Sequence, residues 1–215
     1  MMEMFSPLLN DYSERFTTAH DRVLQQIHDE AMQSHAHAHM LSTHVQGKFL
    51  EMVSTIMRPK YILEIGTFVG YSAICLAKGL QEDGELHTLE LRETDAATAK
   101  ANFHRVDLDK KIHLHVGNAL DIIPTLDIQW DLVFIDADKI SYTQYYELVL
   151  PRLSDRGMII ADNVLFHGEV LEEPVKGKSA KAIQAFNQHV MDDERSEQVL
   201  VTMRDGLLLI RKKHN

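Results

Sequence analysis

The chain has 215 residues, of which 45% are hydrophobic and 25% are charged, and its formal net charge is −10 at neutral pH. This composition is typical of one large folded domain and excludes a disordered chain. The negative charge opposes non-specific attraction to nucleic-acid phosphates, although it does not exclude a local basic patch. The single cysteine, Cys75, excludes a disulfide framework. No apolar run approaches the roughly 20 residues of a membrane span, and we expect a cytoplasmic protein.

The first quarter of the chain is predicted to be helical. Apolar residues recur at helical spacing over residues 8–33 and again over residues 44–57, where Pro59 closes the helix. Short apolar runs then alternate with helical segments, a pattern typical of an α/β sheet. The predicted strands are residues 61–65, 85–91, 112–116, 131–135 and 158–161. The predicted helices are residues 72–78, 94–105, 119–126, 142–150 and 180–190.

Two apolar runs, residues 198–203 and 207–211, end the chain, and Asp205-Gly206 lies between them. This pair is a hairpin signal, so the last two strands are predicted to be antiparallel neighbours at the sheet edge. The predicted fold class is α/β: a Rossmann-like, mostly parallel sheet with helices on both faces and one C-terminal antiparallel hairpin. We expect a single domain over residues 1–215, with residues 1–58 as a helical extension over the active site and 59–215 as the sheet domain.

A glycine-containing turn, Glu64-Ile-Gly-Thr-Phe-Val-Gly70, follows the first predicted strand. Glycine there lets a ligand approach the backbone closely. Phe68 stands where a pyrophosphate-binding turn has glycine, so NAD and FAD are disfavoured, and a turn without any ligand is the alternative. Glu90 ends the second strand, where a carboxylate can accept hydrogen bonds from both ribose hydroxyls. With the glycines and Ser72, it outlines a nucleoside pocket that suits S-adenosylmethionine.

Oxygen-bearing side chains follow two later strands. Asp136 and Asp138 follow the fourth predicted strand, and Asp162 and Asn163 follow the fifth. Ligands of an open parallel sheet bind outside the carboxyl ends of its strands, so these clusters and the glycine turn are expected to converge on one crevice. Two carboxylates and an amide oxygen suit Mg²⁺ and leave positions for water or substrate. The alternative is that the aspartates only cap the helices that follow.

Lys139 follows Asp138 directly, at the rim of the same expected crevice. An amine near a bound metal loses its proton more readily, and the neutral amine could then take the proton of a substrate hydroxyl. An ordinary exposed lysine is the alternative. The histidine-rich segment at residues 34–40, with His44, is predicted to be a polar loop over the active site. Histidines at alternate positions cannot all face one ion on a helix, so a metal tract is disfavoured.

Five short segments occur in a characteristic order: Met40-Leu-Ser-Thr-His-Val-Gln-Gly47, Leu63-Glu-Ile-Gly-Thr-Phe-Val-Gly-Tyr-Ser72, Gly117-Asn-Ala-Leu120, Ile135-Asp-Ala-Asp-Lys139 and Ala161-Asp-Asn163. In this order they resemble the cation-dependent O-methyltransferases, which include the caffeoyl-CoA and catechol enzymes. The resemblance implies a methyltransferase fold that binds S-adenosylmethionine. By that resemblance, the cofactor contacts are Ser42, Glu64, Gly66, Ser72, Glu90, Ala119 and Asp138.

The same resemblance assigns the remaining site residues. It places the metal on Asp136, Asp162 and Asn163, and it makes Lys139 the match of the proposed base of the catechol enzymes. His167 stands where plant relatives place a substrate-contacting asparagine, so it is the candidate substrate residue. The predicted activity is O-methylation of a small vicinal diol with S-adenosylmethionine and Mg²⁺, or another divalent cation such as Mn²⁺ or Ca²⁺.

Alternative functions remain open on the sequence. One is methylation of a hydroxylated wobble uridine in tRNA, for which the basic residues near the last loop are Lys176, Lys178 and Lys181. Plant relatives that act on CoA esters use basic side chains in the N-terminal segment, whereas Arg15 and Arg22 are the only cations here before Lys48, so by the resemblance a CoA ester is disfavoured as acceptor. Two further alternatives are a nucleoside-binding module without catalysis and, more distantly, an NAD-dependent dehydrogenase. By the resemblance, members of this family commonly form dimers, and the C-terminal hairpin places a strand at the edge of the sheet. We therefore expect a homodimer.

Overall fold

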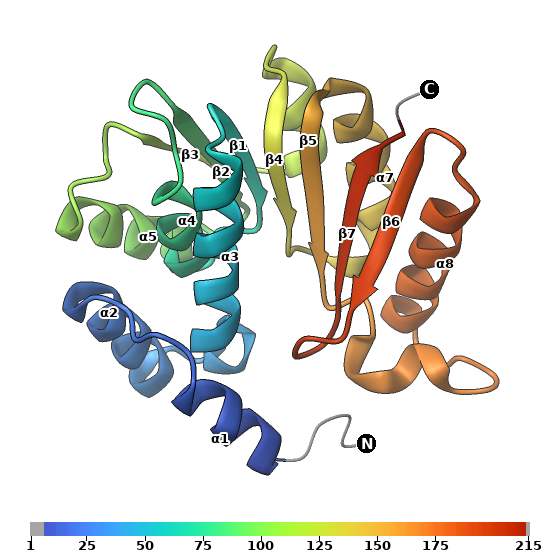
Figure 1. Ribbon diagram of the computed structural model, residues 1–215, viewed down its shortest axis with the longest axis horizontal. Coiled ribbons are helices and arrows are strands. Elements are labelled where there is room, and N and C mark those ends of the chain that lie inside the picture. Colours follow the sequence, from blue (N-terminus) through green and yellow to red (C-terminus); the bar gives the residue numbers. More distant parts are fainter. Residues whose placement is uncertain (1–6, 214–215) are drawn as a thin grey trace. The chain divides into compact units, whose positions relative to one another are not determined.

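The computed structural model describes residues 7–213, which divide into two compact units, residues 7–118 and residues 119–213. Figure 1 colours the first unit from blue to green and the second from yellow-green to red. Each unit has strands and helices of its own. The single domain over residues 1–215 therefore stays a prediction, and residues 1–6 of the expected extension lie outside the described part. Within residues 7–213, no helix has both the length and the apolar character that crossing a bilayer requires.

Three parallel strands form the centre of the first unit. They are β1 (Tyr61–Ile65), β2 (Glu85–Glu90) and β3 (Ile112–Val116), with β2 in the middle. Ile65 pairs with Leu89 and Glu90 pairs with Val116, so the carboxyl ends of the strands meet at one edge. The helices α4 (Tyr71–Ala77) and α5 (Glu93–Arg105) pack on these strands. The predicted strands are confirmed, with β2 one residue shorter than expected.

The helices before β1 are α1 (Pro7–Arg15), α2 (Arg22–Ser34), the short 3₁₀ helix η1 (Ala38–Met40) and α3 (His44–Met57). The predicted helix over residues 44–57 is confirmed, and α3 packs along α4 (Figure 1). The prediction of one helix over residues 8–33 is wrong. The side chain of Asp21 accepts a hydrogen bond from the Leu24 N–H and begins a new helix, and the buried His20 bonds to the Tyr71 hydroxyl at 2.6 Å.

Four strands form the sheet segment of the second unit, in the order β4, β5, β7, β6. β4 (Trp130–Ile135) and β5 (Leu153–Asp162) are parallel, whereas β7 (Leu207–Lys212) is antiparallel to both β5 and β6 (Ser196–Val201). The predicted hairpin is therefore confirmed, and so is the mostly parallel α/β fold class. β5 is longer than the predicted residues 158–161 because Leu153 already pairs with Trp130.

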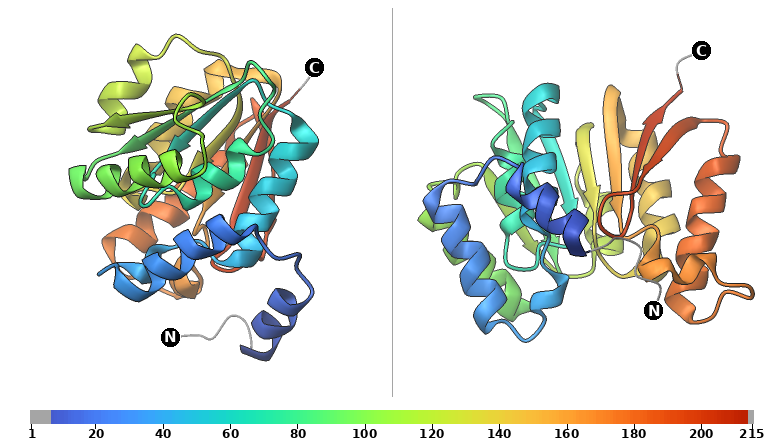
Figure 2. Two further views of the ribbon diagram at one scale, coloured as in Figure 1. Left: turned by 90° about the vertical axis from the view of Figure 1, so that its left-hand side faces the viewer. Right: turned by 60° about the horizontal axis from the view of Figure 1, so that its bottom comes forward.

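Helices of the second unit pack against these strands. They are α6 (Ala119–Ile122), α7 (Tyr142–Val149) and α8 (Lys178–Asp192), with the 3₁₀ turns η2 (Ile123–Thr125), η3 (Lys139–Ser141), η4 (Leu150–Arg152) and η5 (Phe166–Leu171). Figure 2 shows α8 beside β6. The predicted helix over residues 119–126 tightens into η2 at Pro124, which has no N–H to donate. Large buried side chains, among them Trp130, Tyr142 and Phe186, fill the core of this unit.

Candidate functional site

The glycine turn after β1 is held in place by Glu90 at the end of β2. The Phe68 N–H donates to Glu90 Oε2 at 2.7 Å, and the Arg92 N–H donates to Glu90 Oε1 at 2.9 Å. Glu90 is only 6% exposed. A carboxylate offers about four acceptor positions. Glu90 can therefore hold the turn and still accept hydrogen bonds from a bound hydroxyl, as the nucleoside prediction requires.

Backbone conformation explains the glycines of this turn. Gly66 has φ 100° and Gly70 has φ 85°, in the region that L side chains rarely adopt. A Cβ atom on Gly70 would also lie 2.5 Å from the Phe103 ring, so this glycine serves the packing of α4 on α5. Behind the turn, the fully buried Glu64 accepts a hydrogen bond from the Thr88 hydroxyl at 2.5 Å. The turn is thus supported by buried polar bonds on both strands.

The structure gathers several predicted cofactor residues in the first unit. Glu64 and Gly66 belong to the turn, Glu90 bonds to it, and the buried Ser72 follows it in α4. Ser42 is buried just before α3. Ala119 and Asp138 belong to the second unit, where Ala119 begins α6. The contacts of all seven residues with a cofactor stay predictions.

The histidine-rich segment lies against the same turn. The His35 ring meets the Phe68 ring edge-on, with 4.4 Å between centroids, and His35 Nε2 lies 3.1 Å from a carboxylate oxygen of Asp95 in α5. His44, farther along, has its Nε2 2.9 Å from the main-chain oxygen of Thr18. These contacts tie the segment to neighbouring helices of the first unit and bring it over the predicted cofactor turn.

In the second unit, the oxygens of two predicted metal ligands converge on one positive charge. Lys139 Nζ donates hydrogen bonds to Asp136 Oδ1 at 2.9 Å, to Asn163 Oδ1 at 2.8 Å and to the Tyr142 hydroxyl at 2.7 Å. The third predicted ligand, Asp162, is fully buried, and its Oδ1 accepts the Asn163 N–H at 2.7 Å. The carboxyl ends of β4 and β5 therefore bring together side chains that lie 24 residues apart in sequence.

Electrostatics keep Lys139 charged in this arrangement. Burial alone would lower the pKa of Lys139, but the charges of Asp136 and Asp162 and the contact with Tyr142 outweigh it and raise that pKa above its usual range. Burial also raises the pKa of Tyr142, whose hydroxyl donates to the main-chain oxygen of Asp162 at 2.9 Å. Lys139 is thus an ammonium here, and it can act as a base only when another positive charge offsets the carboxylates.

The same donor set fits a divalent cation. Carboxylate and amide oxygens are the ligands that Mg²⁺ prefers, and it commonly keeps several waters beside one or two carboxylates. Asp136 and Asn163 already direct one oxygen each at a single cationic centre, the Lys139 ammonium. A cation at this position would take over those oxygens and release the amine. The residues present are therefore compatible with the predicted metal.

Asp138 behaves differently from Asp136. Its Oδ2 accepts hydrogen bonds from the Ser141 N–H at 3.2 Å and from the Ser141 hydroxyl at 2.6 Å, and its Oδ1 accepts the Tyr145 hydroxyl at 2.5 Å. This is the helix-capping arrangement that was the alternative for the aspartates of this segment. Asp138 is nevertheless exposed, so free lone pairs of the carboxylate can face a ligand.

Sequence reasoning missed Asp205, which it treated only as part of a hairpin turn. Asp205 is 5% exposed, and its carboxylate accepts hydrogen bonds from Asn163 Nδ2 at 3.2 Å and from the His167 N–H at 2.5 Å. It therefore orients both a predicted metal ligand and the candidate substrate residue. The predicted hairpin could have located Asp205. A strand antiparallel to β5 must begin beside the carboxyl end of β5, and Leu207 of β7 pairs there with Asp162.

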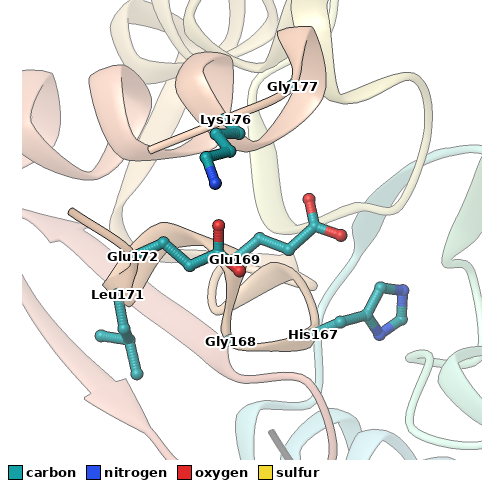
Figure 3. Close-up of a pocket in the computed structure, with 7 residues that line it drawn as sticks. All are labelled: His167, Gly168, Glu169, Leu171, Glu172, Lys176 and Gly177. Carbon is teal, nitrogen blue, oxygen red and sulfur yellow. The ribbon is translucent and has the colours of Figure 1, made fainter. Parts of the chain in front are cut away.

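A pocket of about 470 Å³ lies in the loop between β5 and α8 (Figure 3). His167, which has φ 56° and a 59% exposed side chain, stands at one end of it. The amine of Lys176 points toward Glu172, and Glu169 extends into the same space (Figure 3). The lining residues are His167, Gly168, Glu169, Leu171, Glu172, Lys176 and Gly177. This pocket has the size of a small-molecule site and an acidic lining.

Comparisons with known proteins cover nearly all of the chain. A family model described as O-methyltransferase matches residues 14–213. A catechol O-methyltransferase from Niastella koreensis is 41% identical over 147 residues, which are 66% of this chain and 66% of that protein. The SAH-bound methyltransferase PaMTH1 of Podospora anserina has a TM-score of 0.91 and 26% identity, covering 100% of this chain and 97% of that one. An O-methyltransferase from Bacillus cereus in complex with SAH has a TM-score of 0.88 and 29% identity, covering 96% and 97%.

Proposed function

The chain belongs to the O-methyltransferase family, and on that premise we propose that it transfers the methyl group of S-adenosylmethionine to one oxygen of a small vicinal diol, with Mg²⁺ bound by Asp136, Asp162 and Asn163. One observation carries the metal-dependent part: Asp136 and Asn163 each direct an oxygen at one cationic centre, within 2.9 Å of it. Mn²⁺ or Ca²⁺ would suit the same oxygens.

The cofactor half of the proposal rests on the first unit. The Glu90 carboxylate is buried, oriented by two backbone N–H groups and placed at the end of β2, so it can accept hydrogen bonds from ribose hydroxyls. Gly66, which has φ 100° and no side chain, lets the rest of the cofactor lie close to the backbone of the turn. Both structural relatives carry SAH, which is the demethylated product of the cofactor. Ala119 and Asp138 complete the proposed set by family resemblance alone.

Replacing Glu90 with alanine is expected to weaken binding of S-adenosylmethionine by about 1.5–3 kcal/mol, because charged hydrogen bonds to the ribose are lost. Calorimetric titration of the variant measures this change. Glu93→Ala serves as the control, since Glu93 is an exposed acid on the first turn of α5. Tight binding of NAD without any response to S-adenosylmethionine would overturn the cofactor assignment.

The residues of the second unit have separate roles in the proposed reaction. When bound, Mg²⁺ would lower the pKa of a coordinated hydroxyl and orient it for attack. Asp205 orients Asn163 and His167, and Tyr142 positions the Lys139 amine. Once the charge of Asp136 is offset, the Lys139 ammonium would first lose its own proton to solvent, and the neutral amine would then receive the proton of the acceptor hydroxyl. The methyl group passes from the sulfonium sulfur to that oxygen in one displacement, which leaves SAH. Positioning and exclusion of water supply much of the acceleration.

The pocket beside His167 supports a small, uncharged acceptor. Glu169 and Glu172 line this pocket together with Lys176, so its lining carries more acidic than basic side chains and disfavours a phosphate group (Figure 3). The pocket volume of about 470 Å³ is in the range of small-molecule sites. Both features favour a catechol-like compound over a CoA ester or tRNA.

A competition assay tests this preference. Catechols, CoA esters and undermodified tRNA are offered at equal concentration, with and without Mg²⁺, and kcat/KM measures the discrimination. We expect a catechol to be methylated preferentially, and only with the metal. If tRNA outcompetes every catechol, and alanine at Lys176, Lys178 and Lys181 abolishes that preference, then the RNA-methylating function replaces the one proposed here.

We also propose that the protein is a cytoplasmic homodimer. β6 is the last strand of the sheet segment in the second unit, and its Val199 and Leu200 are 56% and 39% exposed. An exposed edge strand with apolar side chains is a common pairing surface. A single-chain mass in light scattering at micromolar concentration would contradict the dimer.

A further inference from the structure

A second group of potential metal ligands lies in the first unit, on one face of β2 and β3. Glu85 and His87 belong to β2, and His113 and His115 belong to β3. His87 pairs directly with His113 across the two strands. Residues two apart along a strand share a face, so all four side chains project from the same side. One oxygen of Glu85 and one ring nitrogen each of His87 and His113 lie within 4.8 Å of one another.

The separations in this group are compatible with those of ligands around one metal ion. Glu85 Oε2 lies 3.5 Å from His87 Nε2 and 3.6 Å from His113 Nε2. The His113 Nε2 atom is buried and has no hydrogen-bond partner among the described residues. Ligand atoms about 2.0–2.2 Å from a tetrahedral ion stand about 3.4 Å apart. An ion between these three atoms would satisfy all of them with little movement.

His115 supplies the support that a metal-binding imidazole needs. Its Nε2 lies 3.0 Å from His87 Nδ1, and the two rings stack at an angle of 12°. When His87 Nδ1 donates this hydrogen bond to His115, the lone pair of His87 Nε2 faces Glu85 and can bind an ion.

We propose that Glu85, His87 and His113 bind a divalent transition-metal ion, with His115 orienting His87 and water in the fourth position. Two imidazoles, one carboxylate and an open position form a known zinc arrangement. The side chains of Glu85 and His113 are 45% and 41% exposed, so the group lies near the surface, although the His113 Nε2 atom itself is buried. Imidazole nitrogens distinguish this site from the all-oxygen set of Asp136, Asp162 and Asn163.

This site is separate from the glycine turn. His87 precedes Glu90 by three residues on β2, which is about 10 Å along a strand. The two side chains also project from opposite faces, because an odd number of positions separates them. The ion is therefore expected to stabilise the β2–β3 pair without taking part in cofactor binding.

Another group with suitable residue types gives a matched control. Glu147, His189 and Asp193 lie together in the second unit. Arg195 occupies that cluster, with its Nη2 2.8 Å from a Glu147 oxygen and 2.6 Å from Asp193 Oδ2. A guanidinium already bound to both carboxylates repels a second cation, so this group is an ion-pair network.

The test is a calorimetric titration with Zn²⁺ on chelator-treated full-length protein, in excess Mg²⁺ so that the oxygen ligands are already saturated. Co²⁺ absorption reports tetrahedral coordination in parallel. His113→Gln and Glu85→Gln replace exposed side chains and are expected to fold, whereas His87 is buried. His189→Gln controls for the second cluster, and His37→Gln controls for the histidine-rich segment.

Wild-type protein is expected to bind one high-affinity equivalent of Zn²⁺ that raises its melting temperature. His113→Gln and Glu85→Gln should each weaken that equivalent by at least about tenfold and remove the thermal shift. Both control variants should keep it, and binding of S-adenosylmethionine should stay unchanged in His113→Gln, Glu85→Gln and His189→Gln. Wild-type affinity in His113→Gln and Glu85→Gln, or loss of the equivalent in His189→Gln or His37→Gln, would overturn the proposal.

Discussion

Removing divalent cations with EDTA is expected to abolish methyl transfer, and adding Mg²⁺ is expected to restore it. The physical reason is that Asp136, Asp162 and Asn163 carry only oxygen donors, and two of these oxygens already converge on one cationic centre. In the proposed reaction a bound metal would lower the pKa of the acceptor hydroxyl and orient it toward the methyl group, and the chelator removes that contribution. Methyl transfer from labelled S-adenosylmethionine to a catechol measures the effect.

Variants of the ligands should separate metal binding from cofactor binding. Asp162→Ala and Asn163→Ala are expected to lower kcat/KM for the acceptor by at least about 100-fold, because each removes a ligand that orients the reacting oxygen. Calorimetric affinity for S-adenosylmethionine should change little. Asp155→Ala, an exposed acid on β5, is the matched control. Full activity in EDTA would refute the metal-dependent mechanism.

Replacing Lys139 with methionine is expected to lower kcat by about 10²–10⁴-fold, the usual contribution of a general base. The variant should also show how much the Lys139 ammonium contributes to the stability of the metal-free protein. Lys139 donates to Asp136 and Asn163, and its loss leaves the partly buried Asp136 carboxylate without its ion-pair partner, while Asp162 keeps Arg204 Nη1 at 4.0 Å. In EDTA we therefore expect the free energy of unfolding to fall by about 3–5 kcal/mol.

Added Mg²⁺ should reverse that destabilisation, because the cation replaces the charge that the substitution removes. Mg²⁺ is also expected to bind Lys139→Met more tightly than wild type, since no ammonium competes for the same oxygens. Denaturant unfolding with and without Mg²⁺ measures both effects, and Lys213→Met, an exposed lysine of the same unit, is the control. Unchanged turnover in Lys139→Met would exclude Lys139 as the base, and unchanged stability in EDTA would exclude its structural role.

Local patterns in the sequence predicted most of the secondary structure. Alternation of apolar runs with helical spacing located β1, β3, α3 and the C-terminal hairpin, because burial of one face imposes a period on the residues. The resemblance to catechol and caffeoyl-CoA O-methyltransferases is confirmed as well. The break between α1 and α2 was missed, because the apolar spacing continues through it while His20 bonds to Tyr71, 51 residues away.

The fold class, the family and the candidate ligands could be predicted from the amino-acid sequence, since these depend on residue type and order along the chain. The folded structure was needed to show that the Lys139 ammonium lies between Asp136 and Asn163, that Asp205 orients Asn163, and that Glu90 bonds to the turn at Phe68. Such contacts join residues from different strands and turns. Their geometry depends on how the strands pair and on the balance of burial and charge, which no local periodicity records.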